Sequence, residues 1–261
     1  ATWYEKHDIS STDMHPFLHA FSPAIDPPWE AKTDHETFKA LAFEFSRLAK
    51  KHLGVRKDIV SVPLLHDTPG QIAQPGGHAP DWKNTPGMVG VPGKNMPNFV
   101  TVERDYGALY DMYTTVGPLF DKLGATTKFI TYDLKDEVAK MAKEFGVMDS
   151  GKGAGRPALD TDVKISEAIL MISGTSNGEV AVKGFKELEK QTGLHLMDLA
   201  EGNEERRITF PMTQAAPQPV MTSPEWSGSE TGGRRYAPFT VNIEKKKPFH
   251  TLTGRMHFFL D

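Results

Sequence analysis

The histidines and carboxylates near the N-terminus are the residues with the clearest capacity for chemistry. His7, His15 and His19 lie close to Asp8 and Asp13. Residues 15 and 19 are four apart, a spacing that can place two imidazoles on one metal ion if the segment is helical. The sequence has no H-E-x-x-H motif. Hydrogen bonding of these side chains to backbone is therefore the favoured interpretation, and we expect them to bind no metal.

Other possible catalytic signals fail on their spacing. Residues 151–155 read Gly-Lys-Gly-Ala-Gly and residues 90–94 read Gly-Val-Pro-Gly-Lys, but neither fits a phosphate-binding loop. The basic run Lys245–Lys247 is interpreted as a solvated strand end, with a contact to phosphate or to an acidic partner as the alternative. No G-x-S-x-G nucleophile motif occurs. The residues alone indicate no self-contained catalytic set.

Composition narrows the classes of protein further. The 261 residues include no cysteine, which excludes disulfides, thiol catalysis and cysteine ligation of iron–sulfur clusters within this chain. The net charge of -4 argues against a nucleic-acid binder, which would carry a basic excess. No run of about 18 apolar residues is present, so we expect a soluble chain without a membrane span.

Hydrophobic spacing predicts the elements that must position any site. Thr33 and Glu36 form a capping-box pair before a helix whose apolar stripe comprises Phe38, Leu41, Ala42, Phe45, Leu48 and Ala49. Helices are expected over 34–52, 106–123, 134–145, 161–172 and 179–192, with a short one near 195–200 and none after residue 201. Strands are expected at 58–63, 98–103, 127–132 and 219–223. This alternation predicts an α/β fold, a layered αβα domain with a mainly parallel sheet and an extended C-terminal strand region.

Three segments are expected along the chain. Residues 1–29 form an irregular entry segment, held to the body by burial of the aromatic side chains Trp3, Phe17, Phe21 and Trp29. Residues 30–235 form the α/β domain, with a long Pro/Gly-rich loop at 66–97. Residues 236–261 are extended strands. The chain starts without a methionine and stops within a strand-like run, so we expect it to be a fragment of something longer.

Several segments resemble one known family. The N-terminal stretches 1–8 (ATWYEKHD), 11–17 (STDMHPF) and 26–30 (DPPWE) are similar to the catalytic α subunit of membrane-bound respiratory nitrate reductases, within the molybdopterin oxidoreductase family. Further similar stretches follow in the family's order: 102–106 (VERDY), 117–119 (GPL), 159–161 (LDT), 177–183 (NGEVAVK), 223–228 (SPEWSG) and 251–255 (TLTGR). Singly most are weak, but together they are specific to the nitrate reductase branch.

The resemblance implies a cofactor and a reaction. It implies that the parent subunit reduces nitrate to nitrite with molybdenum in bis-molybdopterin guanine dinucleotide and an iron–sulfur cluster. The family's Asp ligand to molybdenum and its His/Cys cluster ligands precede this segment, so the fragment alone is expected to carry no cofactor and no catalytic residue. Thr2, Trp3 and Arg255 border the cofactor domains in the family layout and are candidate cofactor contacts. A fold-closing pairing of Arg255 with a carboxylate is the favoured alternative.

The family position also suggests a substrate approach and partners. His7, Asp13 and His15 are candidates to line the approach of the anionic substrate. The parent is expected to join an iron–sulfur β subunit and a membrane haem γ subunit at the cytoplasmic face of the inner or cell membrane. The segment would frame the cleft, with its last residues leading toward a missing barrel-like domain. A non-enzymatic α/β binding or interaction domain is the competing class, and a start codon close to Ala1 would favour it.

Overall fold

The computed structural model describes residues 4–12, 15–62, 98–117, 120, 124–127, 130–192 and 195–221. Contacts divide the chain into two compact units. The first comprises residues 1–52 and 107–240, and the second comprises 53–106 and 241–261. The segments 66–97, 222–261 and Lys245–Lys247 lie outside the described residues. The organisation expected from the sequence, with boundaries at 29 and 235, stays a prediction.

The first unit opens with a β-hairpin rather than an irregular segment. Strand β1 (Asp8–Thr12) pairs antiparallel with β2 (His15–Phe21), and β2 pairs antiparallel with the short β7 (Gln218–Pro219). The expectation of an irregular 1–29 was therefore wrong for these residues. The polar composition of this segment obscures a short alternation of buried and more exposed side chains on β2, in which Leu18 is buried and its neighbours Phe17 and His19 are more exposed.

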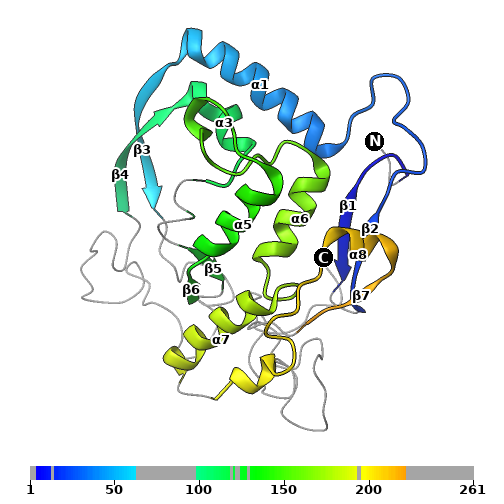
Figure 1. Cartoon of the computed structure of the whole chain (residues 1–261). Coiled ribbons are helices and arrows are strands. Elements are labelled where there is room, and N and C mark those ends of the chain that lie inside the picture. The colour runs from blue at the N-terminus through cyan, green and yellow to red at the C-terminus, as the bar shows by residue number, and fades with distance from the viewer. Residues whose placement is uncertain are drawn as a thin grey trace, which may run out of the picture. The chain divides into compact units, whose positions relative to one another are not determined.

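Helices form most of the first unit (Figure 1). Helix α1 (Asp34–His52) agrees with the predicted helix from first to last residue. Its successors are α3 (Leu109–Tyr113), α5 (Lys135–Phe145), α6 (Asp162–Ile172), α7 (Gly178–Thr192) and α8 (Phe210–Ala215). Short 3-10 turns occur at η1 (Tyr106–Ala108), η2 (Gly151–Gly153) and η3 (Met197–Ala200). The last of these lies within the short helix expected near 195–200.

Two helix predictions need correction. The helix expected over 106–123 is split, since α3 ends at Tyr113 and the residues up to Gly117 are not helical. A break before Pro118 fits the loss of a backbone donor and the steric clash that proline introduces. Helix α8 was not predicted at all. It is short, with Pro211 in its first turn, and six residues are too few to show a hydrophobic period.

The parallel sheet predicted from the sequence was wrong. All three sheets of the described residues are antiparallel: β1-β2-β7, β3-β4 and β5-β6. The segment expected as one strand at 127–132 is a tight pair, β5 (Ala125–Thr127) with β6 (Ile130–Tyr132). Strands that are consecutive in the chain pair here with one another, whereas a parallel pair needs a crossover, usually a helix, between its strands.

The second unit is described through one long hairpin. Strand β3 (Val55–Val62) pairs with β4 (Asn98–Asp105) in register from Val55 opposite Asp105 to Val62 opposite Asn98. Its base is closed by the Tyr106 hydroxyl, which donates to Asp58, and by the Tyr106 N–H, which donates to the Gly54 carbonyl at 3.3 Å. Both strands were predicted. The apolar run at 58–63 suggests a buried strand, but the described side chains of β3 are exposed or only partly buried.

Helix α1 buries a narrower face than the apolar stripe of its sequence predicts. Its buried residues are Ala42, Ser46 and Ala49, whereas Phe38 and Leu41 of the predicted core stripe are 59% and 60% exposed. Small side chains let α3 approach closely, and the Tyr110 N–H of α3 donates to Ser46 Oγ at 2.8 Å. The predicted stripe is thus buried at Ala42 and Ala49, as expected, whereas its large apolar side chains are exposed and Ser46, outside the stripe, is buried.

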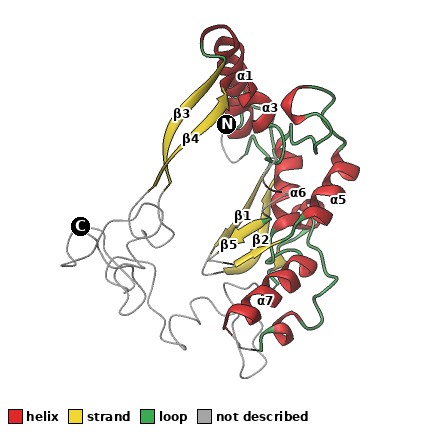
Figure 2. Cartoon of the chain, turned by 90° about the vertical axis from the view of Figure 1, so that its left-hand side faces the viewer, coloured by secondary structure: helices red, strands yellow, loops and turns green. Residues whose placement is uncertain are grey.

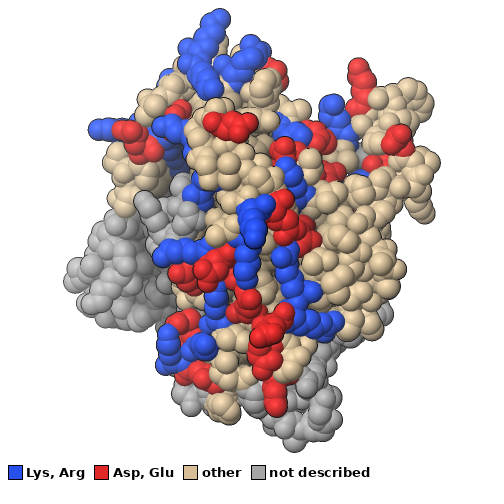
Figure 3. All heavy atoms as spheres, in the orientation of Figure 1, with Lys and Arg blue, Asp and Glu red and all other residues tan. Residues whose placement is uncertain are grey.

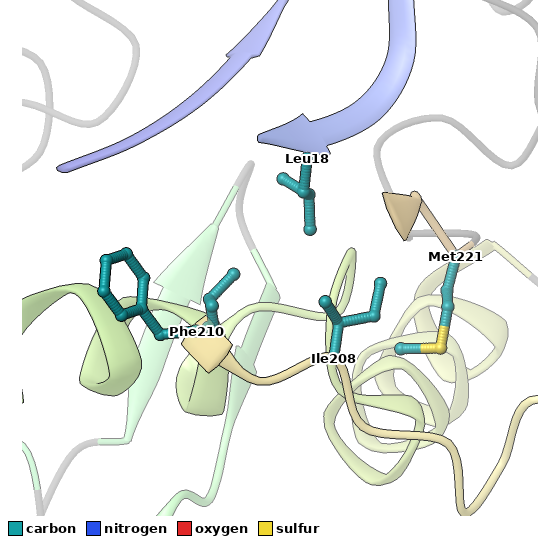
Figure 4. Packing of buried hydrophobic residues seen from close by; sticks show 5 residues of the cluster. Leu18, Ile208, Phe210 and Met221 are labelled. Carbon is teal, nitrogen blue, oxygen red and sulfur yellow. The ribbon is translucent and has the colours of Figure 1, made fainter. Parts of the chain in front are cut away.

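One apolar cluster holds the β1–β2 hairpin against the helices of the first unit. Leu18 of β2 packs with Leu170 of α6, Ile208, Phe210 and Met221 (Figure 4). The hairpin contacts α6 and α8, and in Figure 2 the helices α5 and α6 lie on one side of β1 and β2. Two of the four expected aromatic anchors do not serve this purpose, because Trp29 is 97% exposed and Phe17 is 39% exposed. Phe21 is partly buried, and Trp3 lies outside the described residues.

A buried carboxylate connects α6 with the segment that leads into α8. Glu167 is 4% exposed, and its Oε2 accepts the Phe210 N–H at 2.5 Å. Its Oε1 accepts from the Arg207 guanidinium, which also reaches Glu144 at 3.2 Å. Arg207 therefore neutralises the buried charge of Glu167, and the hydrogen bond from Phe210 fixes the start of α8.

We expect Glu167→Gln to destabilise the protein by about 3 kcal/mol, near the lower end for breaking a buried pair because Arg207 keeps partial access to water. The glutamine amide would also present a donor to the guanidinium. Urea denaturation measures the change in the free energy of unfolding. Glu187→Gln is the control, since Glu187 forms a surface pair with Lys190. Equal stability of the two variants would contradict the assigned role.

Candidate functional site

One polar pocket of the first unit collects side chains from three parts of the chain. Its volume is about 180 Å³. The segment leading into β1, the first turn of α1 and the first turn of α6 all contribute to its wall. The lining residues are Lys6, His7, Asp8, Thr33, Asp34, His35, Asp162, Ile165 and Ser166.

Lys6 is the central cation of this pocket. It is 8% exposed, and its Nζ lies 2.9 Å from Asp8 Oδ2 and 2.8 Å from Asp34 Oδ2. Hydrogen bonds to Asp34 and to Asp8 raise the pKa of the Lys6 ammonium. The same ammonium lowers the pKa of the Asp34 carboxyl, chiefly through its hydrogen bond. The pair therefore stays ionised and ties the N-terminal segment to α1.

Two imidazoles of the pocket carry unsatisfied nitrogens. His7 packs edge-on against Phe210 with ring centres 6.0 Å apart, and its Nδ1 is buried without a hydrogen-bond partner. His35 stacks on Tyr113 at 5.6 Å, and its Nε2 is likewise buried and unpartnered. Burial raises the pKa of the Tyr113 hydroxyl, so the stacking partner stays neutral. Buried polar atoms normally have partners, so these two call for an explanation.

The first turns of the two helices bring ligand-type side chains together. A ring nitrogen of His35 and one carboxylate oxygen each from Glu36 and Asp162 lie within 4.8 Å of one another. Thr33 Oγ1 donates to Asp162 Oδ1 at 3.1 Å and accepts the Glu36 N–H at 3.1 Å, which confirms its predicted role as a cap. Among the described residues, this set is the one that could hold a metal ion.

The structure brings His7 alone of the predicted site residues into the pocket. Thr2, Trp3, Asp13 and Arg255 lie outside the described residues. His15 is the first residue of β2, where its backbone faces Thr12.

The helical metal-binding spacing considered for residues 15 and 19 does not apply. Both lie on β2, where four residues span about 13 Å rather than one helical turn. Sequence reasoning missed His35, Glu36 and Asp162, because nothing in the linear pattern places the start of α6 beside the start of α1. The capping signal at Thr33 located that helix start, but gave no sign of its partner.

The outer surface of the helices shows no concentration of one charge in the view of Figure 3, where basic and acidic side chains alternate over α5, α6 and α7. Described ion pairs account for part of this pattern. They include Lys140 with Glu179, Lys164 with Asp160 at 2.7 Å, and Arg207 with Glu144 at 3.2 Å. Exposed pairs of this kind contribute little to stability.

This pocket does not fit the dinucleotide cofactor implied by the family resemblance. A pocket of about 180 Å³ lies below the roughly 300–1,000 Å³ typical of small-molecule sites. The chain has no cysteine and so offers no thiolate to iron or molybdenum. What the pocket can do is hold ions or water between three segments of the fold.

Fold and pocket together define an α/β segment with a polar site. Residues 123–244 match the family model described as nitrate reductase alpha chain, domain V. The nitrate reductase alpha subunit of Mycobacterium tuberculosis (strain H37Rv) is 60% identical over 260 residues, and the nitrate reductase alpha chain of Bacillus subtilis (strain 168) is 47% identical over 263. The respiratory nitrate reductase 2 alpha chain of Escherichia coli (strain K12) is 41% identical over 261 residues.

Each of these matches covers 100% of this chain and 21% of the relative. The chain therefore belongs to the nitrate reductase alpha-chain family, as the resemblance predicted, and spans about a fifth of the length of the curated relatives it matches. Among the residues that the structure describes, no helix has both the length and the hydropathy needed to cross a bilayer.

We expect Asp34→Asn to lower thermal stability at neutral pH by an amount that disappears in acid. The lowered pKa of Asp34 means that its carboxylate stabilises the fold above the ordinary aspartate range, and this contribution is lost as the pH falls below about 4. The loss at pH 7 should be about 1 kcal/mol or less, because Asp34 is largely exposed. Asp26→Asn, at an exposed position, is the control in thermal melts from pH 3 to 8. A gap between Asp34→Asn and wild type that does not shrink between pH 7 and pH 3 would contradict the assignment.

Proposed function

We propose that this chain is a non-catalytic part of the subunit that reduces nitrate to nitrite in anaerobic respiration. The observation that carries the proposal is the similarity along the whole chain to proteins named nitrate reductase alpha subunits, up to 60% identical among the relatives given above. The absence of cysteine and of a nucleophile motif supports a framing role for this segment. The reacting atoms would then lie on other parts of the same subunit.

The proposed cofactor is molybdenum in bis-molybdopterin guanine dinucleotide, with an iron–sulfur cluster nearby. Such a group supplies oxygen-atom transfer, while the protein supplies binding, orientation and electrostatics. Thr2, Trp3 and Arg255 are the proposed contacts of this chain to the cofactor, with a carboxylate pairing of Arg255 as the alternative. A guanidinium suits a phosphate, since its planar fork donates two parallel hydrogen bonds.

The proposed setting is a membrane-associated complex at the cytoplasmic face. An iron–sulfur β subunit would deliver electrons, and a haem-containing γ subunit would anchor the assembly in the membrane. The Escherichia coli relative named respiratory nitrate reductase supports a respiratory role.

The proposed substrate approach consists of His7, Asp13 and His15. Nitrate is an anion, so protonated imidazoles would favour its entry and a carboxylate would oppose it unless the carboxylate is paired. His7 offers one supporting observation, because its buried Nδ1 has no partner in the described structure. These residues would tune charge and hydrogen bonding around the substrate without forming bonds to it.

The isolated chain should have no nitrate reductase activity and should bind no molybdenum. One wall of an interdomain cleft cannot retain a cofactor held from several sides, and no thiolate is present to hold a cluster next to it. Elemental analysis for molybdenum and a viologen-coupled nitrate assay on the purified chain test this. Measurable turnover by the chain alone would overturn the framing role.

In the complete enzyme, His15→Ala and Asp13→Asn should each change nitrate turnover while the molybdenum content stays at the wild-type level. The effect should fall on the pH profile and on the Michaelis constant, because both depend on charge near the substrate. His19→Ala is the matched control on the same strand. Wild-type kinetics in both variants would reject the substrate-approach role, without touching the family assignment.

A further inference from the structure

The two helix starts in the pocket present a ligand set that the nitrate reductase function does not use. His35 and Glu36 belong to the first turn of α1, and Asp162 is the first residue of α6. One imidazole nitrogen and two carboxylate oxygens meet within 4.8 Å. This combination of nitrogen and oxygen donors is the kind that binds divalent transition-metal ions such as zinc.

Unsatisfied nitrogens point to an occupant. Of the described residues, three have a buried side-chain nitrogen or oxygen without a hydrogen-bond partner, and two of these, His7 and His35, line this pocket. A buried group left unpaired costs about 1–3 kcal/mol. A bound ion with its water would satisfy such nitrogens, and water alone is the competing occupant.

The charge of the pocket favours a cation over an anion. Three carboxylates of the pocket, those of Asp8, Asp34 and Asp162, face the ammonium group of Lys6, and the adjacent Glu36 is paired with Lys39. Two negative charges remain when the imidazoles are neutral. The N-termini of α1 and α6 oppose this with about half a positive charge each. The carboxylates prevail, so about one negative charge is left for a cation to neutralise.

The supporting contacts resemble those that orient metal ligands. Thr33 Oγ1 holds Asp162 through Oδ1, and Lys39 Nζ holds Glu36 through Oε1 at 2.6 Å. A carboxylate has two oxygens, so these bonds are compatible with metal ligation, and hydrogen-bonded carboxylate ligands are the rule in metal sites. The Tyr113 ring fixes the plane of His35 by stacking at an interplanar angle of 15°.

The space and the distances are also suitable. Tetrahedral zinc with bonds of about 2.0–2.2 Å needs ligand atoms about 3.4 Å apart. The ligand atoms lie within 4.8 Å of one another, so the side chains must close by up to about 1.4 Å. A pocket of about 180 Å³ accommodates an ion and the water that would complete its coordination, given about 30 Å³ per water.

We propose that His35, Glu36 and Asp162 bind a divalent transition-metal ion, with zinc as the best fit, and that this ion joins the starts of α1 and α6. The site has three protein ligands and leaves a fourth position to water. It is independent of molybdenum and of nitrate reduction. An ion there stabilises the junction between the N-terminal segment and the helices.

The test uses the full 261-residue chain, freed of metal by dialysis against a chelator. Cobalt(II) chloride replaces zinc as a spectroscopic probe, and visible absorption follows its binding. We expect one cobalt per chain at micromolar protein, displacement by zinc chloride, and a higher melting temperature with either ion. No visible band and no thermal shift would overturn the proposal in favour of a water-filled pocket.

Variants assign the ligands. His35→Ala and Glu36→Gln should each weaken cobalt binding at least tenfold, in line with the loss of one ligand. His52→Ala removes an exposed imidazole from the last turn of α1, and His19→Ala removes one from β2. Both controls should bind cobalt as the wild type does. Circular dichroism confirms that each variant is folded. If His35→Ala does not fold, the result for Glu36→Gln decides. Binding that survives the substitution of the ligands would reject the assigned set.

Discussion

The described part of the first unit depends on a carboxylate that is held away from water. Glu167 receives the guanidinium of Arg207 and the N–H of Phe210, so it fixes where the chain enters α8. Phe210 then lies both against the ring of His7 and in the cluster around Leu18. The ion pair of Glu167 with Arg207 thus helps to fix Phe210, which packs in the core and against His7 of the pocket. An unpaired charge at this depth would cost more than most single contacts of the fold contribute.

The position of that carboxylate follows from helix geometry. Glu167 is the middle residue of α6, so Leu170, three residues on, emerges on the same face and meets Leu18. Asp162, at the beginning of the same helix, lies at the pocket. A single short helix therefore carries a polar end, a charged middle and an apolar end, each matched by a different segment of the chain. Core and pocket are consequently coupled, because a rotation of α6 would move all three.

Local signals were predictable from the sequence, and long-range pairings were not. The 3.6-residue period and the Thr33 cap predicted α1 to the residue, since both depend only on neighbours along the chain. Which side of α1 is buried depends on α3, and Ser46 rather than Phe38 proved to be the contact. The strands β3 and β4 were predicted, whereas β1 and β2 were missed in the polar N-terminal segment. The pairing of the strands was not predicted, because alternation carries no information on direction. In the pocket, His7 was singled out by residue type, whereas the meeting of Glu36 with Asp162 has no trace in the linear pattern. The family resemblance rested on short strings along the whole chain and was confirmed.

The order in which these contacts can form is set by how far apart they lie in the chain. Gln214 Nε2 donates to Ser22 Oγ at 2.9 Å across 192 residues, and three core partners of Leu18, namely Ile208, Phe210 and Met221, lie in the same late segment. A ribosome that adds about 5–20 residues per second needs roughly 10–40 s to cover that distance. During this interval the core around Leu18 lacks these three partners, although Leu170 of α6 is made earlier. The N-terminal hairpin therefore completes its packing late in synthesis, and until then its open edge is a surface that a chaperone can hold.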